Sequence, residues 1–200
     1  MTLALIDYGA GNLHSVANAL RAAGCDDLAF TADPGAVARA DRIVLPGVGA
    51  FGACAAALRA IPGRVEAMER RVRGEGAPFL GVCVGMQLMA DEGEEMGTHA
   101  GLGWVSGRVA KLEPTLAAKV PHMGWNDVRP TAPHPLLAPG EAYFLHSYAF
   151  TGSDVLATTD HSGSVTAAIG RDTMIGVQFH PEKSQAYGLA LLKRFLEWKP

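Results

Sequence analysis

Residues 78–87 read Pro-Phe-Leu-Gly-Val-Cys-Val-Gly-Met-Gln and place a cysteine between two glycines at the end of an apolar run. Residues 78–82 have the character of a buried strand, and the residues from Gly85 onward indicate the start of a helix. Cys83 is therefore expected on a sharp strand-to-helix corner, the arrangement called a nucleophile elbow. A residue at such a corner has a strained backbone with a positive φ, and its side chain projects out of the chain.

The surroundings of Cys83 favour a reactive thiol. Gly81 and Gly85 carry no Cβ, so the strand and the helix can approach each other closely around the cysteine. The N-terminus of the helix lies beside the sulfur, where its partial positive charge favours the thiolate over the thiol. The alternative is a buried structural cysteine, which is the usual role of a free cysteine. This segment alone leaves both interpretations open.

A second segment, far along the chain, favours catalysis. Residues 176–182 read Gly-Val-Gln-Phe-His-Pro-Glu, so a strand ends in a histidine, a proline and a carboxylate. The proline biases His180 toward an extended conformation, in which residues i and i+2 point to the same side. Glu182 can then hold one imidazole nitrogen while the other faces the thiol of Cys83. This is the arrangement of nucleophile, base and orienting acid.

The composition is typical of a compact globular domain. Of the 200 residues, 48% are hydrophobic and 18% are charged, and the net charge is −3. We therefore expect a single domain over residues 1–200, with a sizeable core and no nucleic-acid partner. Residues 1–7 lack the basic region of a signal peptide, and no apolar run is long enough to span a membrane. The sequence predicts a cytoplasmic protein with no membrane partner.

The cysteines and histidines follow no metal-binding pattern. Cys25, Cys54 and Cys83 have neither a disulfide-framework nor a metal-ligand spacing, which fits a reducing compartment. The sequence contains neither a His-Glu-x-x-His motif nor paired Cys-x-x-Cys motifs. We therefore expect no metal and no other cofactor.

The first half of the chain alternates strand and helix patterns. Strands are expected over residues 3–6, 28–31 and 42–45, and helices after Asn12 and over residues 34–39, 53–60 and 63–73. Such alternation predicts a parallel sheet. The last of these helices carries a mixed charged face, on which Arg64 is expected to be solvated.

Two glycine segments follow strands of this sheet. Gly9-Ala-Gly11 resembles the start of a dinucleotide fingerprint, but His14 stands where the third glycine is needed, so a tight turn with Asn12 as the helix cap is favoured. Residues 46–49 read Pro-Gly-Val-Gly, and glycines at this edge leave peptide N–H groups uncovered. That segment is equally compatible with a simple turn and with a loop that donates hydrogen bonds to an oxyanion beside Cys83.

From Trp104 the chain changes character. Alternating segments at residues 104–111, 120–123, 127–129 and 142–150, interrupted by prolines, predict antiparallel strands after a loop at residues 91–103. Residues 155–159, 165–169 and 174–178 continue the strands. The apolar positions from Tyr187 to Leu196 predict a closing amphipathic helix.

Motifs along nearly the whole chain carry a resemblance to a known family. They are Ile-Asp-Tyr-Gly-Ala-Gly-Asn-Leu at residues 6–13, Leu-Pro-Gly-Val-Gly-Ala-Phe at 45–51, Gly-Val-Cys-Val-Gly-Met-Gln at 81–87, Val-Pro-His-Met-Gly-Trp-Asn at 120–126, His-Ser-Tyr at 146–148 and Gly-Val-Gln-Phe-His-Pro-Glu-Lys-Ser at 176–184. Together they resemble the glutaminase subunits of imidazole glycerol phosphate synthases, which are triad-type (class I) glutamine amidotransferases. The resemblance implies an α/β fold with an open, mostly parallel twisted sheet flanked by helices and an additional antiparallel β-rich layer.

The same resemblance implies an activity and a set of site residues. Glutamine would be hydrolysed to glutamate by a triad of Cys83, His180 and Glu182. The backbone N–H groups of Val48 and Val84 would bind the oxyanion. The two ends of the L-glutamine substrate would be held by Gly49, Gln87, Ser147 and Tyr148.

The resemblance also implies a partner. The ammonia would pass to a (β/α)₈ cyclase subunit, in a heterodimer that makes imidazole glycerol phosphate and aminoimidazole carboxamide ribotide in histidine biosynthesis; the partner is expected to be a separate chain. An exposed tryptophan among polar groups is a typical interface anchor, so the docking surface is expected around Asn12, Met123, Trp125 and Asn126. A buried core tryptophan is the alternative for Trp125.

Two other function classes fit the sequence less well. A cysteine hydrolase of the α/β-hydrolase type shares the elbow, but its acid precedes its histidine in the chain, whereas Glu182 follows His180. A non-catalytic binding module is expected to have lost a member of the triad, and all three members are present here.

Overall fold

The first half of the chain alternates strands and helices, as its hydrophobic pattern predicts. In the computed structural model, which describes residues 1–116 and 118–200, the elements are β1 (Leu3–Ile6), α1 (Leu13–Ala22), β2 (Leu28–Thr31), α2 (Pro34–Arg39), β3 (Arg42–Leu45), α3 (Phe51–Arg59), α4 (Arg64–Glu69), the π-helical turn η1 (Arg70–Gly74) and β4 (Phe79–Val82). Asn12 begins α1, because its Oδ1 accepts a hydrogen bond from the N–H of Ser15 at 3.3 Å.

The second half of the chain consists mainly of strands. After the short helix α5 (Val84–Gln87) come β5 (Glu92–Gly93), β6 (His99–Ala100), β7 (Gly107–Lys111), β8 (His122–Pro130), β9 (Gly140–His146), β10 (Tyr148–Gly152), β11 (Val155–Asp160), β12 (Ser164–Arg171) and β13 (Met174–Val177). The chain then forms the 3-10 turn η2 (Pro181–Lys183) and α6 (Gln185–Glu197).

Three segments of this half differ from the prediction by more than a shift of strand ends. Residues 120–123 and 127–129 contribute to a single strand, β8, and residues 142–150 form two strands that separate at Ser147. The hydrophobic alternation continues on both sides of Ser147, so it contains no sign of this break. Residues 91–103, expected as a loop, include the short strands β5 and β6.

The strands described form a nine-stranded sheet, in the order β2-β1-β3-β4-β13-β12-β11-β8-β9, and a four-stranded sheet, in the order β10-β7-β5-β6. From β2 to β13 neighbouring strands are parallel, and from β13 to β9 they are antiparallel. The expected mostly parallel sheet with an antiparallel part is therefore confirmed, although most antiparallel strands extend the main sheet. The register pairs Val82 with Val177, so the residues after β4 and β13 emerge together.

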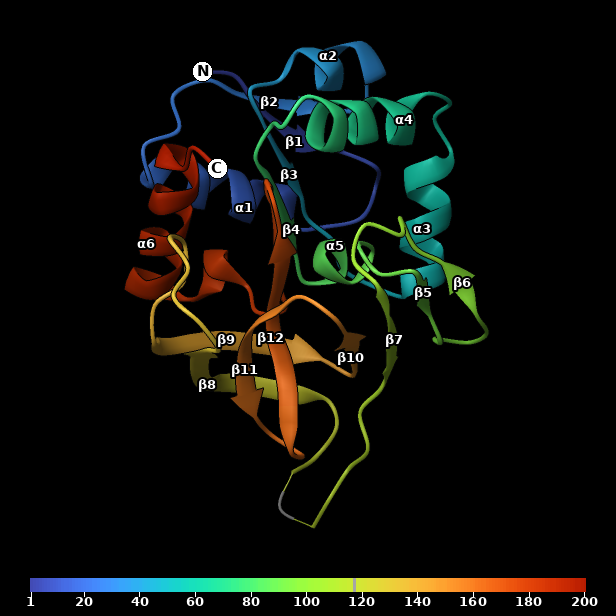
Figure 1. The fold of residues 1–200 in the computed structure, drawn as a ribbon, viewed down its shortest axis with the longest axis vertical. Coiled ribbons are helices and arrows are strands. Elements are labelled where there is room, and N and C mark those ends of the chain that lie inside the picture. Colours follow the sequence, from blue (N-terminus) through green and yellow to red (C-terminus); the bar gives the residue numbers. More distant parts are fainter. Residues whose placement is uncertain (117) are drawn as a thin grey trace.

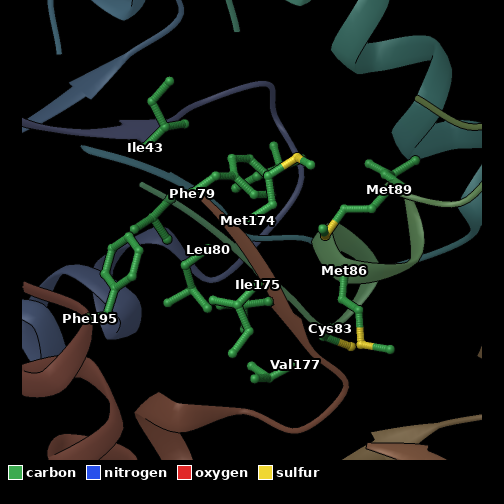
Figure 2. Packing of buried hydrophobic residues seen from close by; sticks show 14 of the residues in the cluster. Ile43, Phe79, Leu80, Cys83, Met86, Met89, Met174, Ile175, Val177 and Phe195 are labelled. Atoms are coloured by element: carbon green, nitrogen blue, oxygen red, sulfur yellow. The ribbon is translucent and has the colours of Figure 1, made fainter. Parts of the chain in front are cut away.

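Helices cover both faces of the parallel strands. Figure 1 shows α1 and α6 on one side of the central strands and α3 and α5 on the other. All residues of β4 and β13 are buried. Figure 2 shows Ile175 and Val177 on the side of Phe195, and Met86 of α5 on the opposite side. This double coverage explains why the strands read as continuous apolar runs.

The prediction that Arg64 is solvated is wrong. Its side chain is buried, with a relative exposure of 1%. The guanidinium donates to the backbone oxygens of Ala57, Leu58 and Asp7. It thus satisfies carbonyls at the C-terminal end of α3, where a positive charge is favourable, and ties that end to the segment after β1.

Candidate active site

Cys83 lies at the corner between β4 and α5. Its φ of 55° and ψ of −112° form a backbone conformation that few residues other than glycine adopt. The neighbouring glycines make the corner possible: a Cβ on Gly81 would lie 2.7 Å from the backbone oxygen of Gly85, and a Cβ on Gly85 would collide with the oxygen of Leu45. The elbow expected from residues 78–87 is therefore present.

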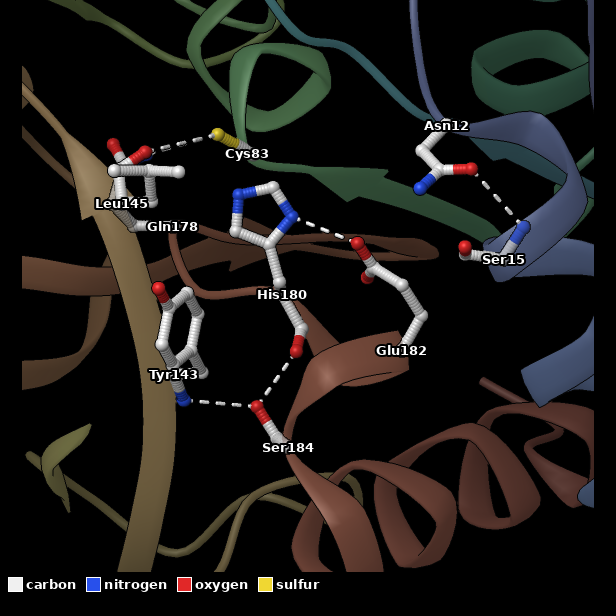
Figure 3. Close-up of polar contacts among 9 residues, drawn as sticks. All are labelled: Asn12, Ser15, Cys83, Tyr143, Leu145, Gln178, His180, Glu182 and Ser184. Carbon is white, nitrogen blue, oxygen red and sulfur yellow. Dashed lines mark hydrogen bonds and ion pairs between the residues drawn. The ribbon is translucent and has the colours of Figure 1, made fainter. Parts of the chain in front are cut away.

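His180 and Glu182 follow β13, the strand beside β4. The Nδ1–H of His180 donates to Oε1 of Glu182 at 2.8 Å, and both side chains are buried. Figure 3 shows the imidazole between this carboxylate and the sulfur of Cys83. Burial lowers the pKa of His180, but hydrogen bonds with Cys83 and Glu182 outweigh burial and raise the pKa to about 9. Thiol, imidazole and carboxylate thus lie in the order that activation of a nucleophile requires.

Gln178 is a buried residue that also contacts the sulfur and that sequence analysis did not identify. Its Nε2 lies 3.8 Å from Sγ of Cys83, and its Oε1 accepts a hydrogen bond from Nε2 of Gln87 at 3.0 Å. Nε2 of Gln87 also donates to the backbone oxygen of Tyr148 at 3.0 Å. The amide nitrogen of Gln87, a residue expected to bind substrate, is therefore engaged by protein acceptors. Gln178 stands in an apolar strand pattern that gives no sign of this role.

Residues 46–49, the oxyanion loop, lie beside the elbow. The N–H of Val84 donates to the backbone oxygen of Gly47 at 3.4 Å. In a trans peptide the C=O and the next N–H point in opposite directions, so the N–H of Val48 points away from that of Val84. The two donors expected to bind an oxyanion do not converge in this conformation.

The carbonyl groups on either side of the Gly47–Val48 peptide each accept a hydrogen bond from a buried side chain. The hydroxyl of Tyr8 donates to the oxygen of Pro46 at 2.7 Å, and the thiol of Cys54 donates to the oxygen of Val48 at 3.4 Å. Burial raises the pKa of both side chains, which keeps them protonated donors. Gly49 has a φ of +105° and open space around it. Rotation within the oxyanion loop is therefore expected mainly at the Gly47–Val48 peptide.

A cavity of about 330 Å³ adjoins Cys83 and His180. Its lining includes Gly49 and Gln87 from the first half of the chain and Ser147 and Tyr148 from the junction of β9 and β10; Val48 and Val84 also line it. The fold thus brings together the residues expected to bind the substrate. The volume suits a small molecule.

Glu95 is a second cavity residue that sequence analysis did not identify. It lies between β5 and β6, and its Oε2 accepts a hydrogen bond from the N–H of Phe51, the first residue of α3, at 2.8 Å. Among the cavity-lining residues of the described chain, it is the one carboxylate. Its neighbours have the composition of an ordinary polar loop, so no pattern distinguished it.

Three of the residues expected to dock a partner lie on β8, and they do not all face the same way. Met123 and Trp125 are 66% and 47% exposed on β8, and Leu145, opposite Met123 on β9, is 37% exposed. We call these three residues the docking patch. Because side chains alternate along a strand, Asn126 faces the other way and is hydrogen-bonded within the protein. Asn12 is exposed at the start of α1.

Two further properties bear on the kind of protein. In residues 1–116 and 118–200, no helix has the length and hydrophobicity needed to cross a membrane. In the same part of the chain, no cluster of three or more His, Cys, Asp or Glu side chains is arranged to hold a metal ion.

Comparison with known proteins gives the family. Residues 4–198 match the model of the family described as "Glutamine amidotransferase class-I". The chain is 62% identical to the "Imidazole glycerol phosphate synthase subunit HisH" of Zymomonas mobilis, covering 100% of this chain and 97% of that protein. The HisH subunit of Caulobacter vibrioides is 53% identical, with coverages of 100% and 99%. The chain belongs to the HisH family of class-I glutamine amidotransferases. It is therefore an enzyme, and the resemblance carried by its motifs is confirmed.

Solved structures agree with the fold of this HisH-family enzyme. A structure described as "Crystal structure of glutamine amidotransferase" is 18% identical with a TM-score of 0.75, and the alignment covers 98% of each chain. A chain of PurLQS from Thermotoga maritima is 17% identical with a TM-score of 0.71, covering 98% of this chain and 95% of that one. At these identities the likeness concerns the fold alone.

Proposed function

We propose that this HisH-family enzyme hydrolyses L-glutamine to glutamate and ammonia with Cys83 as nucleophile, His180 as base and Glu182 as orienting acid. The observation that carries the proposal is the geometry at the cavity: a thiol at a strained elbow, a histidine raised in pKa to about 9, and a carboxylate 2.8 Å from the imidazole. A thiolate beside an imidazolium is the form in which a cysteine attacks an amide.

The reaction follows in two stages. The thiolate of Cys83 attacks the side-chain carbonyl carbon of glutamine, and the carbonyl oxygen becomes an oxyanion. His180 donates its proton to the amide nitrogen, the C–N bond breaks, and ammonia leaves a thioester on Cys83. His180 then takes a proton from water, which attacks the thioester and releases glutamate and the thiolate. Glu182 holds the imidazole in orientation and stabilises its charged form throughout.

The two ends of glutamine require separate partners. The carboxylate of Glu95 faces the cavity and is suited to the α-ammonium group, since a charge-assisted hydrogen bond is stronger than a neutral one. Gly49, Ser147 and Tyr148 line the same cavity and are proposed to hold the rest of the amino-acid moiety, while the amide of Gln87 donates to the oxygen of Tyr148. We expect Glu95→Gln to raise the KM for glutamine more than it lowers kcat.

Labelling of Cys83 tests this proposal. A glutamine-derived electrophile is expected to modify Cys83, identified by peptide mass spectrometry, and glutamine is expected to protect it. Cys25 and Cys54 are buried cysteines in the same chain and provide the internal control. Modification of Cys54 in place of Cys83, or absence of protection by glutamine, would refute the assignment.

We further propose that the oxyanion loop switches the enzyme on. The Gly47 oxygen occupies the N–H of Val84, so an oxyanion can use both donors only after the Gly47–Val48 peptide rotates. Glycine makes that rotation easy. The free subunit is therefore proposed to be nearly silent toward glutamine and to be activated when the partner binds with its nucleotide ligand.

The proposed partner is the (β/α)₈ cyclase subunit of imidazole glycerol phosphate synthase, forming a heterodimer that acts in histidine biosynthesis. The names of the relatives support it, because they are subunits of that synthase. The docking patch supports it as well, because exposed Trp and Met side chains on a rigid strand are typical of interface centres. The cyclase would convert the delivered ammonia into imidazole glycerol phosphate and aminoimidazole carboxamide ribotide.

Substitution of Trp125 tests the docking surface. Trp125→Ala is expected to weaken binding to the cyclase subunit by about 30-fold, the effect of removing an interface residue that contributes about 2 kcal/mol, while the free chain stays folded. Phe30→Ala is the matched control, since Phe30 is 39% exposed on β2. Equal affinities for the two variants in calorimetric titration would exclude Trp125 from the interface.

A further inference from the structure

A row of hydrogen bonds runs from the Tyr148 carbonyl, through His146 at the wall of the cavity, to the strand that bears the docking patch. The backbone oxygen of Tyr148 lies 2.9 Å from Nδ1 of His146, and Nε2 of His146 lies 3.0 Å from Nδ1 of His122. Nε2 of His122 lies 3.0 Å from Nδ2 of Asn126. Both histidines are buried, with relative exposures of 3% and 6% for His122 and His146.

Backbone groups at both ends of this row fix which atoms donate and which accept the hydrogen bonds. At one end, the Tyr148 oxygen can only accept, so Nδ1 of His146 carries a proton. At the other end, Nδ2 of Asn126 donates to the oxygen of Asp160 at 2.9 Å, and its Oδ1 accepts from the N–H of Asp127 at 2.8 Å. A flip of the Asn126 amide would break both bonds, so Nδ2 is the atom that faces His122.

The hydrogen bonds at the two ends of the row determine which ring nitrogen of each histidine carries the proton. Asn126 donates to His122, so Nε2 of His122 carries no proton and its Nδ1 does. That Nδ1–H donates to Nε2 of His146, which accepts because the proton of His146 is on Nδ1. One proton on each ring satisfies all the bonds. A second proton on His146 would place two N–H donors against each other, and a second proton on His122 would oppose the Asn126 amide.

The surroundings keep both rings neutral. The ring of His122 stacks between Phe144, at 4.7 Å between centroids, and His161, at 4.1 Å. Burial lowers the pKa of His122 to about 3, and the neighbouring His146 and His161 act in the same direction. Burial lowers the pKa of His146 to about 4. Near neutral pH neither ring carries a charge.

We propose that His122 and His146, the histidine pair, are positioning residues, both neutral and both in the Nδ1–H tautomer, that hold the Ser147–Tyr148 segment at the glutamine cavity. The segment lies where β9 ends before β10 begins. The oxygen of Ser147 accepts a hydrogen bond from the N–H of Leu112 at 2.9 Å and Tyr148 pairs with Lys111 of β7, so the backbone is held on that side. His146 fixes the Tyr148 carbonyl, which also receives the Gln87 amide. The tautomers follow from the fold alone; their effect on glutamine binding rests on the proposed function.

Nitrogen NMR of the full chain, labelled with ¹⁵N at histidine, reads the tautomers directly. Among the seven histidines, the pair is expected to show protonated Nδ1 and unprotonated Nε2 at pH 7.5. His134 and His161 are internal controls of the opposite kind. Nδ1 of His134 accepts from the N–H of Leu136, and Nε2 of His161 donates to the oxygen of Lys119, so both are expected as Nε2–H. A Nε2–H or doubly protonated ring at either position of the pair would overturn the proposal.

Kinetics of the complex with the cyclase subunit test the positioning role. His122→Phe keeps the stacked ring but leaves Nε2 of His146 without a donor, and it is expected to raise the KM for glutamine about 10-fold, the cost of one unsatisfied buried group. His122→Asn keeps a donor near the Nδ1 position and is expected to restore most of the loss. Ammonia-driven turnover is expected to be unchanged in both variants. If the tautomers are as expected but His122→Phe leaves KM unchanged, the positioning role is refuted. If the unaltered complex shows no glutaminase activity, the proposed function fails and the tautomer result still stands.

Discussion

The elbow around Cys83 and the oxyanion loop lie side by side and differ in how completely they are packed. At the elbow every neighbouring glycine is crowded by backbone: the Cβ positions of Gly81 and Gly85 are filled by the oxygens of Gly85 and Leu45. In the oxyanion loop, Gly47 is crowded as well, because its Cβ position lies 2.7 Å from the backbone nitrogen of Gly85. Gly49, in contrast, has open space where a Cβ would stand, and Val48 is 43% exposed. The proposed nucleophile is held at a crowded corner, whereas the Val48–Gly49 end of the oxyanion loop is open.

This difference separates two requirements of the chemistry. The nucleophile and its base must meet in every turnover, so a rigid corner serves them well. The oxyanion donors are needed only in the transition state, and a rotated peptide withholds them without disturbing the triad. Control of the reaction is therefore expected in the oxyanion loop, and substitutions at the two sites are expected to have different consequences.

The largest effect is expected from removal of the nucleophile. Cys83→Ala is predicted to lower glutamine-driven turnover of the complex by about 10³-fold or more, because no neighbouring group supplies a thiolate at the elbow. Turnover driven by added ammonium should persist. Cys25→Ala, which removes a buried thiol that does not line the cavity and whose Sγ contacts the oxygen of Asp27, is the matched control. Normal use of glutamine by Cys83→Ala would show that another cysteine is the nucleophile.

The next effect belongs to the oxyanion loop. Loss of one oxyanion donor costs roughly 10² to 10³ in turnover, so the complex with nucleotide ligand is predicted to hydrolyse glutamine faster than the free subunit by about that factor. Hydrolysis is measured for the free subunit, the complex and the liganded complex, together with the rate of Cys83 alkylation. Equal hydrolysis in all three would exclude the switch. Equal alkylation with unequal hydrolysis would locate the control at the loop.

A smaller effect, on stability, distinguishes crowded from open glycines. Gly85→Ala places a Cβ against the backbone oxygen of Leu45 and is predicted to lower the free energy of unfolding by about 3 kcal/mol or more. Gly49→Ala meets no atom, but a φ of +105° strains an alanine, and a loss of about 1 to 2 kcal/mol is predicted. Urea unfolding of the two variants gives both values. Similar losses would mean that the elbow relaxes more easily than its packing indicates.

The smallest effect is a pH dependence from His180. Its pKa is raised in the folded state to about 9 by Cys83 and Glu182, compared with roughly 6.5 in the unfolded chain. A raised pKa stabilises the fold fully below pH 6.5, and this contribution is lost as the pH rises through 9. Glu182→Gln removes part of it. The difference in unfolding free energy between the unaltered protein and Glu182→Gln is therefore predicted to shrink from pH 6.5 to pH 9; a difference that grows with pH would contradict the assignment.

The parallel part of the sheet was predicted closely because its signals are local. The strands at residues 3–6, 28–31 and 42–45 and the helix at residues 34–39 have the expected bounds, since each is a short apolar run or a capped turn of helix. The elbow was also predictable, because Gly81 and Gly85 determine which backbone can pass there. The triad was inferred from the spacing of His180 and Glu182 around a proline.

What the sequence did not reveal depends on contacts across the fold. Glu95 reaches the cavity only because β5 lies beside β7, and Gln178 contacts Cys83 only because β13 pairs with β4. The burial of Arg64 follows from carbonyls at the end of α3. The same glycine permits two orientations of the Gly47–Val48 peptide, so the sequence does not determine which one the protein adopts. None of these features has a local pattern.

The position of β13 has a consequence for synthesis on the ribosome. This strand pairs with β4 in the middle of the sheet, although the Gln178–Cys83 contact spans 95 residues of chain. The elbow therefore emerges long before the strand that carries His180 and Glu182, and until then β4 has an unpaired edge on that side. The thiol of a nascent chain has no base beside it, and the central sheet closes in the same late step that completes the triad. The strand that completes the middle of the sheet is thus also the one that brings the proposed base to Cys83.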